Sequence, residues 1–414
     1  MRSGFLIAIA SVPLCVAFTA CGDDFEACEA TRTCTGEQIQ GGGGQADDAS
    51  GEGAGAGAPI DADGGRSDLG GATSAGGSGG AADIALGGAS EGPSCVNIDT
   101  TSDVENCGSC GHGCLGGDCL LGVCQPIVLA KDQGSYIKIT LASDYVYWTG
   151  DNATIGRVKS DGSTEAEELV PQSAGELGYD NVVVGQTLYW GNDFKDNGVR
   201  GCALPACTTP KTLLSGTLPV DAIHYSAAGK RLLWNQANVI WSRALPAGTS
   251  EVFFTTESRV DDLDSDEAFV YWNEYDPDKG VTKVRKRPLV GGGATLLAET
   301  AHASGTRVFG KQLYLTDGPE AGLHVIPLPN GVGNAATEAF APSKDVTAIA
   351  VDADGVYWAE GGQVDEGTVR WCPHAGCTGA PVIKGSSGYP TSIVTDARAI
   401  YWGIYGGSVI KVAK

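Results

Sequence analysis

An aromatic pair that ends a short apolar run recurs along most of this chain. Its copies are Tyr147-Trp148, Tyr189-Trp190, Leu233-Trp234, Tyr271-Trp272, Tyr314-Leu315, Tyr357-Trp358 and Tyr401-Trp402, at successive spacings of 42, 44, 38, 43, 43 and 44 residues. A fixed period of about 40–45 residues is typical of radial repeats, and four short strands per unit indicate a propeller. The repeat therefore predicts the fold of residues 126–414.

The last unit shows the expected strands most clearly. Alternating β-branched and aromatic residues occupy 391–396, 399–402 and 408–412, with Gly and Asp between them. The chain then stops, and a segment resembling the missing fourth strand lies at 126–130. Sharing one blade between both termini closes a propeller and protects its open edges. We expect an all-β fold, a seven-bladed β-propeller of four-stranded blades, because six blades would discard a degenerate unit and eight would need an extra one.

The aromatic pairs should be structural. Successive side chains of a strand point to opposite faces, so the two rings of each pair should pack against different neighbouring blades. The pattern resembles the YWTD and NHL class of β-propellers, above all in VYWTG at 146–150 and VYWAEGG at 356–362. The resemblance implies a platform that binds proteins or other ligands, with enzymes among the relatives.

Residues 1–20 read as a signal peptide, with Arg2 before an apolar run that is too short to span a bilayer. The following Cys21 ends a segment that resembles a bacterial lipobox, which implies acylation of its thiol. Ordinary cleavage before Cys21 is the alternative, but it would leave an odd number of cysteines in an oxidising compartment. We expect an exported lipoprotein at the outer membrane or cell surface.

Residues 21–93 are rich in Gly, Ala, Ser and Asp and carry about half of the net charge of −23. Such a composition cannot bury enough apolar surface to fold, which predicts a disordered tether. Cys28 and Cys34 could close a small disulfide loop near its start. The combination of tether, cysteine module and propeller resembles exported lipoproteins of the myxobacterial type.

Residues 94–125 form the expected cysteine module, with Cys95, Cys107, Cys110, Cys114, Cys119 and Cys124. Six cysteines in a short exported segment predict three disulfides, with about 15 connectivities open. Zinc bound by these cysteines and His112 is the competing interpretation. The spacing resembles the stigma-specific (Stig1-like) family, which implies an extracellular disulfide module. Two further pairs, Cys202 with Cys207 and Cys372 with Cys377, should close small loops between third and fourth strands.

The charge pattern argues against nucleic acid as a partner, because phosphates attract clustered Lys and Arg. The propeller segment is mildly acidic, and its one basic run, at 283–287, should lie on a solvated outer strand. The sequence contains no nucleophile elbow, no HExxH motif and no phosphate-binding loop. We expect a monomer without a cofactor.

Loops that join second to third strands, and loops that join blades, should share one end of the central channel. Counting back from the aromatic pairs places a polar ring at this mouth: Asp180 (or Tyr179), Asp221, Arg259, His302, Asp345 and Tyr389, with Ser135 or Tyr136 in the first unit. The hypothesis is that this ring binds a small ligand or a partner's side chain. The simpler interpretation is that a wet channel mouth tolerates any polar residue.

Acidic residues are frequent in the loops on the same face: Asp151, Asp193, Asp196, Glu274, Asp276, Asp278, Asp317, Glu320, Glu360, Asp365 and Glu366. They could bind Ca²⁺ or a basic partner, although solvated turn residues have the same composition. An enzyme of the lyase or hydrolase type is the alternative function, with His302 and Asp345 as base and orienting group. We predict a non-catalytic binding platform for a protein or glycan.

Overall fold

The structure is a computed structural model that describes residues 97–414 except 152–154, 172–177, 193–197, 217, 318–321, 329–337, 342 and 363–365. These residues belong to the second of two compact units, Leu86–Lys414. The expected signal peptide, the tether, and Cys21, Cys28, Cys34 and Cys95 lie outside the described residues. In the part of the chain that is described, no helix has the length and apolar character needed to cross a membrane.

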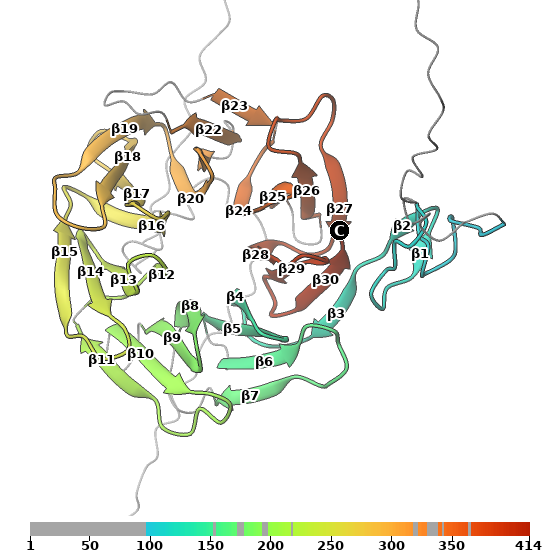
Figure 1. The fold of residues 1–414 in the computed structure, drawn as a ribbon, viewed down its shortest axis with the longest axis horizontal. Coiled ribbons are helices and arrows are strands. Elements are labelled where there is room, and N and C mark those ends of the chain that lie inside the picture. The colour runs from blue at the N-terminus through green and yellow to red at the C-terminus, as the bar shows by residue number, and fades with distance from the viewer. Residues whose placement is uncertain are drawn as a thin grey trace, which may run out of the picture. The chain divides into compact units, whose positions relative to one another are not determined.

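Seven four-stranded antiparallel sheets form a ring, which confirms the predicted propeller (Figure 1). From inside to outside, the first three blades are β4 (Tyr136–Ala142), β5 (Tyr145–Asp151), β6 (Ile155–Lys159) and β7 (Glu167–Val170); β8 (Gly178–Val184), β9 (Thr187–Asn192), β10 (Gly198–Ala203) and β11 (Lys211–Ser215); and β12 (Ile223–Ser226), β13 (Arg231–Gln236), β14 (Val239–Ala244) and β15 (Ser250–Thr255).

The next three blades follow the same order. They are β16 (Arg259–Ser265), β17 (Phe269–Asp276), β18 (Val281–Pro288) and β19 (Thr295–Thr300); β20 (Ala303–Phe309), β21 (Gln312–Asp317), β22 (Leu323–Pro327) and β23 (Glu338–Ala341); and β24 (Val346–Asp352), β25 (Gly355–Glu360), β26 (Thr368–Cys372) and β27 (Val382–Ser386). The innermost strands contact one another around the ring, from β4 through to β28 and back to β4.

The seventh blade is shared between distant parts of the chain, as predicted. It contains β28 (Pro390–Thr395), β29 (Ala399–Ile404) and β30 (Val409–Ala413), and its outer strand is β3 (Ile127–Ala130). Val128 pairs with Ile410, and Ile127 pairs with Lys411. The edge of β30 is therefore covered by the strand that precedes the first complete blade.

The aromatic pairs hold neighbouring blades together. The first residue of each pair packs in the same apolar cluster as the second residue of the next blade, so Tyr401 joins Trp148 and Tyr357 joins Trp402. The same relationship links all other neighbours, including Tyr271 with Leu315 in the unit that lacks a tryptophan. The second residue of every pair is fully buried. The two faces of each second strand thus serve two different interfaces.

The cysteine module lies against the seventh blade and ends in a hairpin of β1 (Cys119–Leu120) and β2 (Val123–Cys124). Disulfides join Cys107 to Cys119 and Cys114 to Cys124, and Cys110 is also disulfide-bonded. The sulfurs of Cys107, Cys114 and Cys119 lie within 4.8 Å of one another, but the disulfides leave none of these three as a thiolate for zinc.

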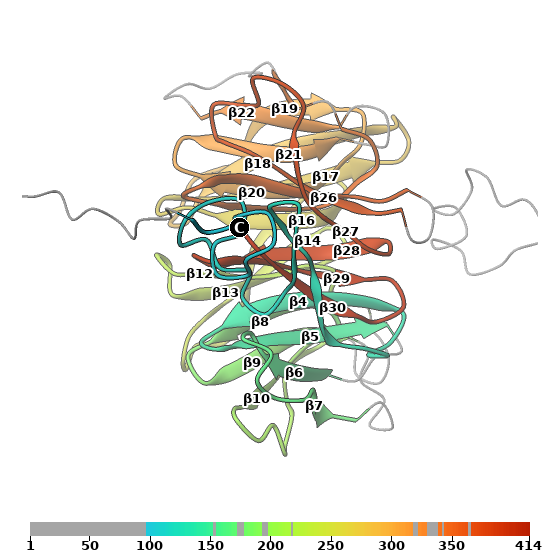
Figure 2. The ribbon, with the colours of Figure 1, turned by 90° about the vertical axis from the view of Figure 1, so that its right-hand side faces the viewer.

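Polar and apolar contacts fix the module to β30. His112 places Nδ1 2.6 Å from the Cys107 carbonyl and Nε2 2.5 Å from the main-chain oxygen of Lys414. Lys411 donates from Nζ to the Leu115 carbonyl at 2.9 Å. Cys107 and Cys114 share an apolar cluster with Ile410 and Val412. Figure 2 shows the module beside β30 in the edge-on view. His112, a candidate metal ligand in the sequence, therefore serves as a docking residue.

The two remaining cysteine pairs form the disulfides Cys202–Cys207 and Cys372–Cys377, each between a third and a fourth strand, as predicted. The basic run on β18 differs from expectation, because it is not a solvated edge. Lys283 is buried and binds Glu257 at 2.5 Å, and Arg285 binds the buried Glu274 at 2.5 Å. Carboxylates therefore neutralise two of its four charges, those of Lys283 and Arg285.

Candidate ligand-binding channel

The innermost strands line the channel and all run from the predicted mouth toward the opposite face. In an open-edged strand the backbone groups that face the channel lack a ladder partner, so side chains or water must satisfy them. Asp180 on β8 and Asp262 and Asp264 on β16 meet this need for amides of β12 and β20. The site is built from these four strands together with β4.

At the mouth, three of the predicted residues gather between the third, fourth and fifth blades. Arg259 lies 3.3 Å from Asp221 and 3.6 Å from Asp261. Burial raises the pKa of Asp261 to about 6, while the charges of Arg259 and His302 partly oppose this rise. The ring of His302 packs on Tyr275 at 5.3 Å between centroids. We call Asp221, Arg259, Asp261 and His302 the mouth group.

Two further predicted mouth residues, Asp345 and Tyr389, lie in a second place, between the sixth and seventh blades. Asp345 accepts a hydrogen bond from the Gly362 amide at 2.9 Å and so holds the loop after β25. Burial, together with the charges of Asp345 and Tyr136, raises the pKa of Tyr389 to about 12. Of the predicted catalytic pair, His302 thus belongs to the mouth group and Asp345 to this second place.

Asp180 lies deeper, in the wall of the channel. Its carboxylate accepts hydrogen bonds from the amides of Asn181 at 2.9 Å and Ile223 at 3.1 Å. Burial raises its pKa to about 6, although the charge of Lys138 opposes this effect. We call Lys138, Asp180, Asp262 and Arg307 the channel layer. Asp262 joins Arg307 at 2.7 Å.

Carboxylates of the wall also join the second blade to the third and the fourth blade to the fifth. Asp180 of β8 accepts from the amide of Ile223, the first residue of β12, as described above. Asp262 and Asp264 of β16 accept from the amides of Thr306 and Val308 on β20 at 2.9 and 2.8 Å. These contacts satisfy open-edge amides and fix the relative position of the inner strands. The carboxylates are thereby rigidly oriented.

Lys138 differs from the other charges of the channel layer. Burial acts to lower its pKa, but the electrostatic effect of Tyr136 and of the carboxylates Asp180 and Asp262 outweighs burial and raises the pKa. Within the described ranges, no side chain or carbonyl accepts a hydrogen bond from its ammonium, which lies 5.5 Å from the centroid of the Tyr136 ring. The side chain is only partly buried. Its ammonium therefore has donors to offer to water or a ligand.

Near the opposite face, His224 completes the wall. Its Nε2 lies 2.8 Å from the Ser265 hydroxyl, and its Nδ1 lies 3.5 Å from Asp264. Burial lowers the pKa of His224, although Asp264 opposes the shift. The ring is therefore neutral at neutral pH. Ser265 also lines a cavity of about 940 Å³ that opens on this face.

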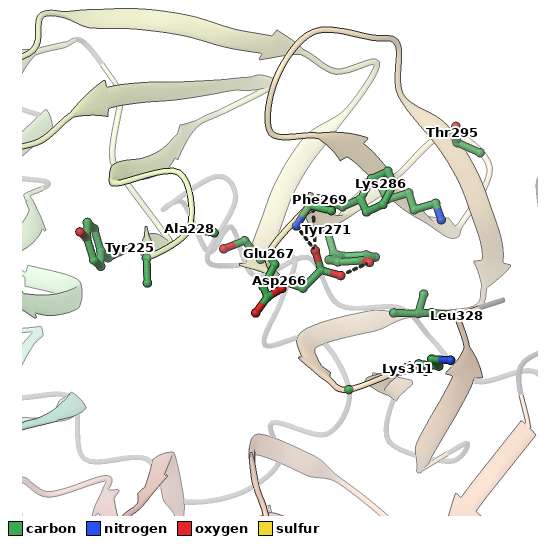
Figure 3. Close-up of a pocket in the computed structure, with 14 residues that line it drawn as sticks. Tyr225, Ala228, Asp266, Glu267, Phe269, Tyr271, Lys286, Thr295, Lys311 and Leu328 are labelled. Atoms are coloured by element: carbon green, nitrogen blue, oxygen red, sulfur yellow. Dashed lines mark hydrogen bonds between the residues drawn. The ribbon is translucent and has the colours of Figure 1, made fainter. Parts of the chain in front are cut away.

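That cavity lies between the third, fourth and fifth blades and was not predicted (Figure 3). Phe269 and Lys286 form one side, with the ammonium 4.6 Å from the ring centroid, and Lys311 and Leu328 line the next blade. Asp266 accepts from the Phe269 amide and the Tyr271 hydroxyl, at 2.7 and 2.6 Å. An equivalent contact joins Tyr401 to Asp396. The Asp266 contact is thus a structural feature of the repeat.

Several residues of the predicted acidic rim have internal partners. Glu274 and Glu360 each accept from the indole of the tryptophan two residues earlier and from an arginine on the next strand. Asp317 accepts from the His302 amide at 2.8 Å. Asp193, Asp196, Glu320 and Asp365 lie outside the described residues. The rim carboxylates with these partners therefore stabilise the blades. Ca²⁺ binding at the rim stays a prediction.

These features define a seven-bladed β-propeller with a charged central channel and a docked disulfide module. No protein-family profile matches the chain, and no curated protein matches its sequence. Among solved structures, the computationally designed protein Ika8 is similar over 69% of this chain and 99% of its own, with 12% identity and a TM-score of 0.45. A protein of unknown function from Bacteroides thetaiotaomicron is similar over 70% of this chain and 72% of its own, with 13% identity and a TM-score of 0.46.

Proposed function

We propose that this protein is an exported, non-catalytic binding platform whose channel takes up a polyhydroxylated ligand, such as a glycan. The observation that carries the proposal is the Lys138 ammonium, which lies over the Tyr136 ring and donates no hydrogen bond to the protein in the described wall. Asp180 and Asp262 lie near enough to raise its pKa and offer acceptor oxygens beside it. A sugar hydroxyl both donates and accepts, so it suits a wall with donors next to acceptors.

The mouth provides ring faces together with these charges. Tyr136, Tyr275 and Tyr389 lie at or next to the mouth ends of β4, β17 and β28. Aromatic side chains present an apolar face and a polar tip, a combination that suits ligands with both apolar C–H faces and hydroxyls. Carboxylates fixed by backbone amides need no reorganisation on binding, which reduces the entropic cost. Both features favour recognition of a glycan over an apolar small molecule.

A glycan array probed with the full chain, followed by calorimetric titration of the best oligosaccharide, tests this proposal. Lys138→Met keeps the length of the side chain and removes the ammonium, and we expect at least a tenfold weaker affinity. Lys211→Met, on the outermost strand β11, is the matched control and should bind like wild type. An array without hits, or a best ligand that binds Lys138→Met normally, would refute the channel as a glycan site. Lys138-dependent binding of peptides would assign the channel to a protein side chain.

A hydrolase or lyase at the mouth is the second candidate, favoured by the geometry of the mouth group. Asp261 has a pKa of about 6 and lies 3.6 Å from Arg259, which also contacts Asp221. A carboxyl group with a pKa near the working pH is suited to general acid–base catalysis. Turnover of a bound oligosaccharide by wild type, lost in Asp261→Asn while binding persists, would replace the binding platform with an enzyme. Binding without turnover supports the first proposal.

We further propose that acylated Cys21 holds a monomer at the bacterial outer membrane. What supports export is the number of disulfides in the described residues, since such bonds persist in oxidising compartments. Detergent phase partitioning of wild type and Cys21→Ser, made in a bacterium that acylates lipoproteins, tests the anchor. Wild type should enter the detergent phase, and the variant should stay in the aqueous phase. Equal partitioning would exclude lipidation at this cysteine.

A further inference from the structure

The hairpin of the cysteine module carries an apolar tip made of Leu120, Leu121 and Val123. These three residues are 59%, 83% and 52% exposed. Leu120 pairs with Val123, so Leu121 and Gly122 form a two-residue turn. Three large apolar side chains at the end of one short hairpin are more than the scattered surface residues of an ordinary soluble domain.

The backbone of this turn is unfavourable for the residue that it presents. Leu121 has φ +53° and Gly122 has φ +76°, the left-handed pair of a type I′ turn. Asn-Gly is the sequence preferred there, because the Cβ of a bulky residue clashes with the backbone in the left-handed region. Leucine at this position gains no burial that would offset the cost, since it is the most exposed of the three. Such strain is typical of functional sites.

The module holds the tip rigidly. The disulfides Cys107–Cys119 and Cys114–Cys124 pin both strands at their bases. The Gly122 amide donates to the Thr101 carbonyl at 3.0 Å, and a Cβ on Gly108 would lie 2.5 Å from the Gly122 oxygen. A tip fixed in this way loses little conformational entropy when it binds.

Charge and composition select one kind of occupant. Residues 97–125 contain Asp99, Asp103, Glu105 and Asp118 and no Lys or Arg. Asp99 binds the amide of Thr101, the residue that holds Gly122, so its carboxylate lies beside the tip. Surfaces that bind bilayers use Lys and Arg around their apolar residues, so an anionic membrane would repel this tip. Two tips facing each other would bring together like charges.

We propose that the tip docks into an apolar cleft, rimmed by Lys or Arg, on a separate protein. Leu121 would fill the centre of the cleft, and the carboxylates of Asp99 and Asp118 would meet the basic rim. Apolar cores with polar rims are the usual anatomy of protein interfaces, and rim charges govern the association rate and its salt dependence. This surface is separate from the channel and does not depend on the function proposed for it.

The test places a photoreactive benzoylphenylalanine at position 120 of the full chain and irradiates it in an extract of the cells that make the protein. The same residue at position 290 is the control, because Val290 is exposed but lies on the fourth blade. We expect a discrete adduct from position 120 only. The peptide mapped on the partner should contain apolar residues together with Lys or Arg.

Leu121→Asn separates recognition from folding, because asparagine suits the left-handed turn and removes the apolar side chain. We expect it to reduce the adduct at least tenfold while the disulfides and the circular dichroism stay unchanged. Raising the salt concentration or introducing Asp99→Asn should also weaken the adduct. An absent adduct, an adduct that is indifferent to Leu121→Asn, or a mapped peptide without basic residues would overturn the proposal. Flotation with neutral or anionic phospholipid vesicles that depends on Leu121 would assign the tip to a membrane instead.

Discussion

Asp262 of β16 and Arg307 of β20 form an ion pair of 2.7 Å across two neighbouring blades, and the same carboxylate oxygen accepts from the Thr306 amide at 2.9 Å. One side chain thus satisfies both a charge and an open-edge amide. This arrangement makes the wall of the channel both a candidate binding surface and a structural connection.

Asp262→Ala should destabilise the propeller, because it removes the carboxylate that accepts from both the Arg307 guanidinium and the Thr306 amide. Hydrogen bonds to charged groups contribute about 1.5–3 kcal/mol, so we expect a loss of about 2 kcal/mol in the free energy of unfolding. Urea denaturation at neutral pH measures it. Asp278→Ala, at an exposed turn, is the matched control and should change stability by less than about 0.5 kcal/mol. Equal effects of the two variants would show that Asp262 does not join the blades.

The fully buried Trp358 should tolerate leucine better than alanine. Trp358→Ala removes most of the side chain from a packed interface and should cost about 3–5 kcal/mol. Leu315 occupies the equivalent position of the fifth blade, so the repeat accommodates leucine there. Trp358→Leu should therefore cost clearly less than Trp358→Ala in chemical denaturation. Equal losses would mean that each interface is shaped for its own residue.

Stability should depend on pH through Asp261. Its pKa in the folded state is about 6, above the ordinary value of 3.8, so the folded protein binds its proton more tightly than the unfolded chain does. The stabilisation is complete below pH 3.8 and is lost as the pH rises through about 6. Wild type should thus lose stability relative to Asp261→Asn between pH 4 and 7. Parallel stability curves for the two proteins would contradict the raised pKa.

The pKa of His224 is shifted in the opposite direction to the pKa of Asp261, so His224 provides an internal check. Burial lowers its pKa in the folded state, so the unfolded chain binds protons more readily. Its contribution is complete above the ordinary value of 6.5 and is lost as the pH falls. His224→Gln should therefore remove a loss of stability that develops as the pH falls below 6.5, whereas Asp261→Asn removes a loss that develops as the pH rises from about 4 to 7. Thermal unfolding from pH 4 to 8 distinguishes them.

The docked module should loosen when His112 is replaced. His112→Phe removes the contacts to the oxygens of Cys107 and Lys414 but leaves the module's disulfides in place. Each such hydrogen bond contributes about 1 kcal/mol, and 1.4 kcal/mol corresponds to a tenfold change in an opening equilibrium. We expect amide exchange in residues 104–125 to accelerate about tenfold, while exchange in β16 stays unchanged. Unchanged exchange in the module would mean that its apolar contacts suffice.

The fold could be predicted because each unit repeats one packing problem. Tyr401 packs with Trp148 in the same way as Tyr357 packs with Trp402. A sequence pattern that is weak in any one unit therefore becomes clear when it is repeated. The shared seventh blade followed from the residues at 126–130, since a strand must cover the edge of β30.

The site could be predicted only in part, because the sequence does not reveal which polar residues find internal partners. Glu274 and Glu360 looked like rim ligands, but each binds a tryptophan indole and an arginine. Asp261 lies beside Arg259 and Asp221, which were predicted. Asp261 itself was missed because the count from the aromatic pair ends at Arg259, two residues earlier. The only signal for it was the acidic run in which it stands, at 261–264.

The ring closes where β3 pairs with β30, and a pulling force on the N-terminal segment would reach the propeller at this seam. A force along the chain toward the propeller passes through the cysteine module and then reaches β3, whose removal from β30 would open the ring. The contacts of His112 with Lys414 and of Lys411 with Leu115 anchor the module to the other side of this seam. These contacts transfer the force to β30 before the force can separate β3 from β30. The module therefore protects the strand pairing that closes the propeller against a pulling force.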